Sequence, residues 1–99
     1  MNMITNDNGV AVFYATTEIK DFIRKILLDY YYDNNQLTDE FNFYDKGIID
    51  SLNGIEILMQ LEKEFNISFN ESDEMKIIHQ CSVNNIYLVL RQYITPSDI

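Results

Sequence analysis

The feature that most limits the fold of this chain is the spacing of its apolar residues, which recur every three or four positions. Between residues 17 and 30 they are Ile19, Phe22, Ile23, Ile26, Leu27 and Tyr30. This spacing places apolar side chains on one face of an α-helix, whereas a half-buried strand alternates at every second position. The same period returns in 51–65 and after residue 82, and only 10–15 suggests a short strand or extra turn. The sequence therefore predicts an all-α protein.

We expect a four-helix bundle made of three main helices and a short third helix. The first helix covers 17–30, and either Thr16 or Thr17 supplies its N-cap. The second helix covers 51–65. Its predicted inward stripe consists of Ile55, Leu58, Leu61 and Phe65, with Glu62 at the edge. Apolar stripes of this width are typical of helices that pack on one core.

The second half of the chain predicts two further helices. The short third helix lies within 71–80 and begins at Asn70 or Ser72, and the fourth begins after Ser82 and ends at Thr95-Pro96. A long connection joins the first two helices, and apolar residues along it should anchor it to the core. These anchors are Leu37, Phe41, Phe43 and Ile48. We therefore expect an ordered loop, as is common for long apolar connections.

The size of the chain bounds its organisation and its location. Ninety-nine residues at 46% hydrophobic content suffice for one domain, which we assign to 17–95, with 1–16 as an N-terminal tail. No apolar run approaches the roughly 20 residues of a membrane helix, and the N-terminus lacks the pattern of a signal peptide. One cysteine, Cys81, fits a reducing compartment. We expect a cytoplasmic protein without membrane insertion.

The negative charge of the chain is unevenly distributed. The net charge is −9, and the segments 29–50 and 51–74 each carry −5, while 1–28 is neutral. Such a field repels nucleic acid and anionic membranes and favours encounter with basic protein surfaces. Solubility is the simpler explanation of the same charge.

Catalysis and metal binding have little support in the sequence. His79 and Cys81 are the only nitrogen and sulfur ligands of note, and two ligands do not make a zinc site. Ser51 as a nucleophile would need a neighbouring base and a third group to orient it, and no motif supplies them. We therefore predict no metal and no enzymatic activity, and packing roles for His79 and Cys81.

Ser51 nevertheless stands at a place suited to another kind of chemistry. It lies where the loop ends and the helix 51–65 begins, beside unpaired backbone N–H groups and the positive end of the helix dipole. That environment stabilises a phosphate, including one attached covalently. In isolation, Asp50 and Ser51 are ordinary capping residues. The surrounding sequence decides between the two interpretations.

The segment from Asp50 to Phe65, DSLNGIEILMQLEKEF, carries the most specific pattern in the chain. It resembles the phosphopantetheine attachment segment of acyl carrier proteins, in which Asp-Ser-Leu begins the second helix. An acid follows five positions after the serine, here Glu56, and a methionine follows at eight, here Met59. An acidic run then precedes an aromatic end. The resemblance extends over about 17–94, since the family also has a long ordered loop ending in glycine and apolar residues, a short third helix, and a last helix opened by Ser/Thr-Val.

The resemblance implies a function for this chain. A phosphopantetheinyl transferase would attach 4'-phosphopantetheine from coenzyme A to Ser51, and the thiol of that arm would hold an acyl group as a thioester. It also implies that Asp50 engages the transferase or its metal. The protein would be a monomer. Its partners would be an acyl- or aminoacyl-loading ligase and a downstream synthase or transferase, each with a basic docking surface. The partner-binding residues implied in this way are Leu52, Glu56, Met59 and Glu62.

Two departures from the family pattern leave the cargo open. Asn53 stands where carriers of fatty acid biosynthesis and lipid metabolism usually have an acid, and Lys63 interrupts the acidic run. The approach to Ser51 also resembles stand-alone D-alanyl carriers, so an aminoacyl carrier charged by an adenylating ligase is the first alternative. The alternative from a different class is an unmodified acidic adaptor or docking bundle.

Overall fold

The computed structural model describes residues 15–30 and 38–94, and these residues form four helices and no strand. The helices are α1 (Thr16–Leu28), α2 (Ser51–Phe65), α3 (Glu71–His79) and α4 (Val83–Leu90). This architecture confirms the predicted all-α bundle of four helices. The third helix is short as expected, with nine residues, but α4 has only eight, so two of the four helices are short. The possible strand at 10–15 lies almost entirely outside the described residues, as does the loop anchor Leu37.

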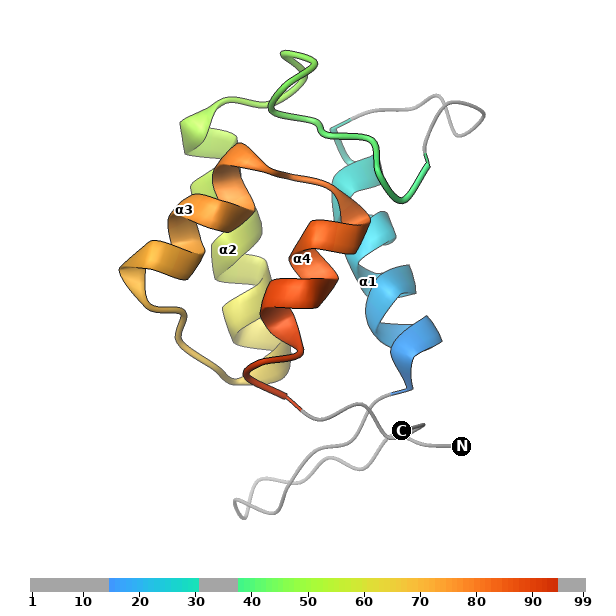
Figure 1. Ribbon diagram of the computed structural model, residues 1–99, viewed down its shortest axis with the longest axis vertical. Coiled ribbons are helices and arrows are strands. Elements are labelled where there is room, and N and C mark those ends of the chain that lie inside the picture. Colours follow the sequence, from blue (N-terminus) through green and yellow to red (C-terminus); the bar gives the residue numbers. More distant parts are fainter. Residues whose placement is uncertain (1–14, 31–37, 95–99) are drawn as a thin grey trace.

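The four helices enclose one hydrophobic core. α1 packs against α4 and α2, and α3 packs against α2 and α4 (Figure 1). The side chains at the centre come from all four helices and from the loop before α2. They include Ile23, Leu27, Phe43, Leu61, Ile77, Ile86 and Leu90. Within the described residues, no helix is long and apolar enough to cross a membrane.

The inward face of α2 differs from the predicted stripe at one position. Leu58, Leu61 and Phe65 are buried as expected, but Ile55 is 46% exposed. Gly54 and Ile57 are buried in its place. The reason is a tertiary contact, because Gly54 lies directly against Ile78 of α3 and thereby turns Ile55 toward solvent.

Two helix ends also differ from the sequence-based expectation. Neither Thr16 nor Thr17 is the N-cap of α1; that position is Ala15, whose N–H donates to Glu18 Oε1 at 3.2 Å. α4 ends at Leu90 rather than at Thr95, because the chain closes into turns there. The N–H groups of Tyr93 and Ile94 both donate to Leu90 O, at 2.9 and 3.2 Å.

The loop from residue 38 to α2 is held to the bundle by buried rings and by one asparagine. Phe43 is fully buried, and Phe41 and Ile48 pack partly against the core, which confirms these anchors. Asn42 Oδ1 accepts the N–H of Cys81 at 3.2 Å, and Asn42 Nδ2 donates to His79 O at 3.2 Å. Asn42 thus fastens the loop to the junction between α3 and α4.

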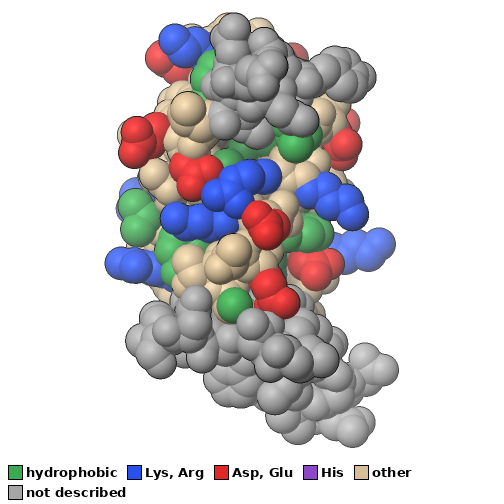
Figure 2. All heavy atoms as spheres, turned by 90° about the vertical axis from the view of Figure 1, so that its right-hand side faces the viewer, with side chains coloured by type: hydrophobic (Ala, Val, Ile, Leu, Met, Phe, Trp, Pro, Cys, Tyr) green, Lys and Arg blue, Asp and Glu red, His purple; other side chains and the backbone are tan. Residues whose placement is uncertain are grey.

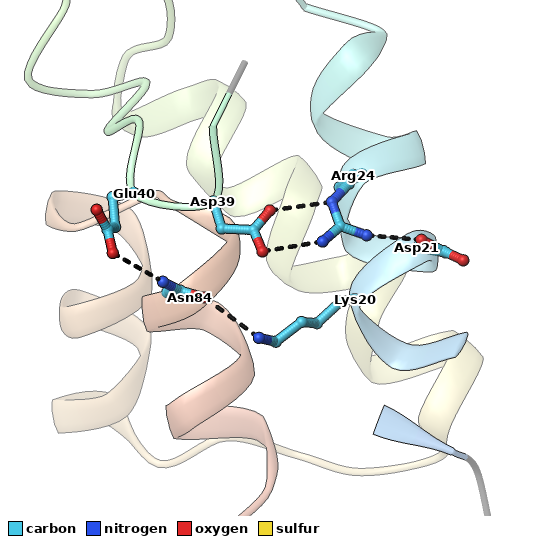
Figure 3. Close-up of polar contacts among 6 residues, drawn as sticks. All are labelled: Lys20, Asp21, Arg24, Asp39, Glu40 and Asn84. Atoms are coloured by element: carbon cyan, nitrogen blue, oxygen red, sulfur yellow. Dashed lines mark hydrogen bonds and ion pairs between the residues drawn. The ribbon is translucent and has the colours of Figure 1, made fainter. Parts of the chain in front are cut away.

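Ion pairs fasten the beginning of the described loop to α1. Arg24 donates from Nε and Nη2 to the two carboxylate oxygens of Asp39, at 3.0 and 2.9 Å, and from Nη1 to Asp21 at 2.6 Å (Figure 3). Asn84 bridges Lys20 of α1 and Glu40 of the loop. These contacts belong to the side of the molecule on which Lys and Arg side chains gather in a central band (Figure 2).

Candidate functional site

The start of α2 is built by a reciprocal pair of side chains. Asp50 has an extended backbone (φ −116°, ψ −173°), and its Oδ1 accepts the N–H of Asn53 at 2.9 Å. In return, Asn53 Oδ1 accepts the N–H of Asp50 at 3.2 Å. Two backbone donors that a helix start leaves unpaired are therefore satisfied. The predicted role of Asp50 as a cap is confirmed, and Asn53 is the other half of that cap.

Ser51 is the first residue of α2 and its side chain is exposed. The N–H groups of Asn53 and Gly54 are paired with Asp50, whereas those of Ser51 and Leu52 have no hydrogen bond among the described residues. The Ser51 hydroxyl thus stands beside unpaired donors at the positive end of a fifteen-residue helix. These features fit a phosphate attached at this hydroxyl.

The approach to Ser51 is fixed by a tight turn. Gly47 has φ +75°, a conformation that side chains other than glycine adopt at a cost. Beyond it, the N–H groups of Ile48 and Ile49 both donate to Phe43 O, at 3.0 and 3.3 Å. Ile49 is buried, an anchor that was not predicted from the sequence. The turn and this buried side chain place Asp50 and Ser51 at the surface.

The inner side of the same helix start is close-packed. A Cβ atom built on Gly54 would lie 2.8 Å from Ile78 Cγ1 and 3.0 Å from Ile78 Cγ2. Only a glycine allows the first turn of α2 to approach the end of α3 so closely. The first turn therefore has one exposed face and one tightly supported face.

Among the described residues, three of the five exposed large hydrophobic side chains belong to α2. Leu52 is 66% exposed and Met59 is 63% exposed, and Ile55 lies with them on the same side of the helix. An open hollow of about 320 Å³ is lined by Glu56, Met59, Gln60 and Lys63 of this helix. Leu52, Glu56 and Met59 therefore share the exposed face that contains the hollow, and Ile55 is a member that the sequence pattern missed.

Glu56 is held in place by one donor from α2 and one from the turn that follows α1. Its Oε1 accepts from the hydroxyl of Tyr30, just beyond the end of α1, at 3.0 Å, and from Asn53 Nδ2 at 3.4 Å. Burial, followed by the hydrogen bond to Glu56, raises the pKa of Tyr30 to about 12. No sequence pattern predicts this pairing, because the whole loop separates Tyr30 from Glu56.

Glu62 occupies a different environment from the other predicted partner-binding residues. It is half-buried, and its Oε2 accepts the N–H of Phe69 at 2.9 Å. Since Phe69 is a buried residue of the connection between α2 and α3, this carboxylate supports that connection. The structure thus brings Leu52, Glu56 and Met59 together and sets Glu62 at their edge.

The remaining candidate residues serve packing. Cys81 is buried, and its burial raises the pKa of the thiol to about 12. His79 is exposed and packs edge to face on Tyr44, with the ring centroids 5.0 Å apart. In the part of the chain that the structure describes, no group of three His, Cys, Asp or Glu side chains is placed to hold a metal ion.

The class of protein that this fold and helix start define is a carrier with a covalently attached arm. Residues 21–77, more than half of the chain, match the family model of the phosphopantetheine attachment site, and the chain belongs to this family. The cofactor of the family is covalently attached 4'-phosphopantetheine, as predicted. No solved structure matches the chain.

Proposed function

We propose that Ser51 carries the 4'-phosphopantetheine arm and that the protein holds an acyl group on it as a thioester for partner enzymes. The Ser51 hydroxyl would attack the pyrophosphate of coenzyme A in a transferase. A phosphodiester would form at Ser51, and adenosine 3',5'-bisphosphate would leave as the pyrophosphate bond breaks. The proton of the hydroxyl passes to a base of the transferase. The thiol at the far end of the arm supplies the thioester chemistry.

The observation that carries this proposal is the exposed position of Ser51 at the first residue of α2 inside the family match. Three serines lie within 21–77, namely Ser51, Ser68 and Ser72. All three are exposed. Ser68 is in the connection between α2 and α3, and Ser72 is the second residue of the nine-residue α3, whereas Ser51 follows a capping aspartate and opens the longest helix. Exposure does not separate the three serines, so the capping aspartate and the dipole of the longer helix are what favour Ser51.

The partners would dock on the exposed face of α2. Leu52 and Met59 supply apolar contact, Glu56 and Glu62 supply charge, and Asp50 would meet the transferase or its metal next to the reacting hydroxyl. A basic docking surface is the natural complement of this face. Exposed ion pairs contribute only about 0–1 kcal/mol each, which suits a carrier that binds and leaves quickly. We further propose a cytoplasmic monomer without catalytic activity.

The proposed cargo is an acyl group, and the alternative is an aminoacyl group loaded by an adenylating ligase. Asn53 favours considering the alternative. It is an amide, whereas the fatty-acid carriers that this chain resembles usually have an acid at that position. Charging the modified protein with an acyl ligase or with an aminoacyl ligase, followed by mass measurement of the thioester, distinguishes the two cargoes.

The test of the attachment site is the intact mass after incubation with coenzyme A and a broad-specificity phosphopantetheinyl transferase. The wild-type chain should gain one phosphopantetheine increment. Ser51→Ala should gain none, while the matched variants Ser68→Ala and Ser72→Ala should be modified like the wild type.

Two outcomes would contradict the proposal. A wild-type chain that stays unmodified, while a known carrier is modified in the same assay, would favour the unmodified acidic adaptor. An increment that persists in Ser51→Ala and disappears in Ser72→Ala would move the attachment to α3. Circular dichroism of each variant establishes that the helices are intact.

A further inference from the structure

A continuous chain of hydrogen bonds runs from the residue before Ser51 to the end of α1. Asp50 and Asn53 exchange two bonds, Asn53 Nδ2 donates to Glu56 Oε1 at 3.4 Å, and the Tyr30 hydroxyl donates to the same oxygen at 3.0 Å. We refer to Asp50, Asn53, Glu56 and Tyr30 as the Glu56 chain. It links the loop–helix junction that precedes Ser51 to the turn that follows α1.

The amide of Asn53 fits both of its neighbours in this chain. The N–H of Asp50 needs an acceptor, so the carbonyl Oδ1 of Asn53 faces it. The NH₂ group then faces Glu56, whose ionised carboxylate accepts and does not donate. An aspartate at position 53 would satisfy Asp50 but would set a second negative charge against Glu56.

The two donors hold one oxygen of Glu56 and leave the other unbonded. Among the described residues, Glu56 Oε2 makes no hydrogen bond, and the side chain as a whole is exposed. It lies beside Met59, at the hollow on the exposed face of α2. A carboxylate whose orientation is already fixed loses less conformational freedom when a cationic group binds it.

We propose that Asn53 and Tyr30 are positioning residues, which fix the Glu56 carboxylate so that its open oxygen receives a cationic side chain of the docking partner. The inference rests on the proposed function, since it concerns docking for the modification of Ser51. It gives Asn53 a specific role, because the amide orders Glu56 where an acid would repel it. Partners adapted to this carrier would therefore recognise one ordered carboxylate, in contrast to a diffuse negative charge.

Charge alone and positioning predict opposite results for Asn53→Asp. The variant adds a negative charge to the face that meets a basic partner, so simple attraction would lower the KM for the carrier. If positioning matters, the variant should instead raise this KM, because the Asn53–Glu56 hydrogen bond is lost and the new carboxylate repels Glu56. Ser68→Asp is the charge-matched control, because it adds the same charge at an exposed residue of the connection between α2 and α3, outside the Glu56 chain and the hollow, and its KM should be equal to or below the wild-type value.

Tyr30→Phe tests the other donor without any change of charge at neutral pH. We expect a KM about two- to fivefold higher in the transferase assay, the size of effect that one exposed charged contact carries, with kcat unchanged. Tyr44→Phe is the matched control, since the Tyr44 hydroxyl makes no hydrogen bond among the described residues. In the background of Glu56→Gln, Tyr30→Phe should raise KM less than it does in the wild type.

The outcomes separate this inference from the proposed function. A wild-type chain that takes no arm overturns the proposed function and this inference with it. A chain that is modified at Ser51, but whose Tyr30→Phe variant has the wild-type KM, overturns the inference alone. The same holds if Asn53→Asp leaves KM at or below the wild-type value as Ser68→Asp does. A raised KM in both variants, with both matched controls at or below the wild-type value, supports the Glu56 chain.

Discussion

The starts of α2 and α3 use the same local device in two different environments. In α2 the cap Asp50 accepts the N–H of Asn53 at 2.9 Å, and in α3 the cap Asn70 accepts the N–H of Asp73 at 2.8 Å. Each start also has a tyrosine that donates to a carboxylate, Tyr30 to Glu56 and Tyr93 to Asp73, at 3.0 and 2.6 Å. The difference is burial, because Glu56 is exposed and Asp73 is 6% exposed.

Burial decides what each carboxylate can do. Asp73 also lies 3.6 Å from Lys76 Nζ, and its tyrosine accepts the N–H of Asn70, so the group is enclosed by its own partners. Glu56 is exposed, and its Oε2 has no hydrogen bond among the described residues. The start of α3 is therefore a structural anchor, while the start of α2 combines order with access. A modification or docking site needs both.

The largest effect on stability should come from removing the buried carboxylate. Asp73→Ala takes the acceptor from Tyr93 and the charge from the first turn of α3, and we expect a loss of about 2–3 kcal/mol in the free energy of unfolding. Asp50→Ala removes an exposed cap and should cost about 1 kcal/mol. Urea denaturation followed by circular dichroism measures both.

Glu74→Ala is the matched control for Asp73→Ala, because it removes the same charge from the same turn without the bond to Tyr93. Its effect should stay within about 0.5 kcal/mol of the wild type. Equal losses for Asp50→Ala and Asp73→Ala would show that the two helix starts contribute alike, and the contrast based on burial would be wrong.

The second prediction concerns the contact that joins these two helices. Gly54→Ala places a methyl group 2.8 Å from Ile78 Cγ1, so side chains or helices must move apart. We expect a net loss of about 1–2 kcal/mol, although alanine favours the helix itself by up to about 1 kcal/mol. In the double variant Gly54→Ala/Ile78→Ala, the loss should be smaller than the sum of the two single losses.

An exposed position on the same helix provides the comparison for Gly54. Gln60→Ala introduces the same residue without a close neighbour, and its stability should equal or slightly exceed that of the wild type. If Gly54→Ala stabilised the protein as Gln60→Ala does, the close support beneath the start of α2 would be disproved. Thermal and urea unfolding of the four variants decide the matter.

The sequence predicted what depends on local pattern. The apolar period located the helices. Asn70, one of the two starts predicted for α3, is its cap, and α4 begins directly after Ser82 as predicted. The position of Ser51 at the start of α2 was also predicted correctly, because a capping aspartate precedes an amphipathic run. These features are determined within one or two helical turns, where sequence spacing and distance in space coincide.

What the sequence could not predict depends on contacts between distant segments. Ile55 and Ile57 are equally apolar, and only the approach of Ile78 to Gly54 decides which one is buried. The bond between Tyr30 and Glu56 joins residues on either side of the loop, so the path of the loop determines it. The partner-facing role of Leu52, Glu56, Met59 and Glu62 stays a prediction.

The smallest expected effect is a pH dependence at the start of α2. The folded-state pKa of Tyr30 is about 12, because of burial and then of its bond to Glu56, whereas a tyrosine in an unfolded chain titrates near pH 10. Its contribution to stability is therefore complete below about pH 10 and is lost as the pH rises toward about 12. Tyr30→Phe should lose less stability over that interval than the wild type does.

The variant Glu56→Gln separates the two causes of this pH dependence. Burial of the phenol persists in Glu56→Gln while the bond to a charged acceptor is lost, so its decline should lie between those of the wild type and Tyr30→Phe. Urea midpoints measured at intervals from pH 9 to pH 12 provide the comparison. A wild-type decline that matched Tyr30→Phe would mean that Tyr30 is not held by Glu56 in solution. Tyr30 would then not order the Glu56 carboxylate, and only the start of α3 would have a carboxylate bound by a tyrosine.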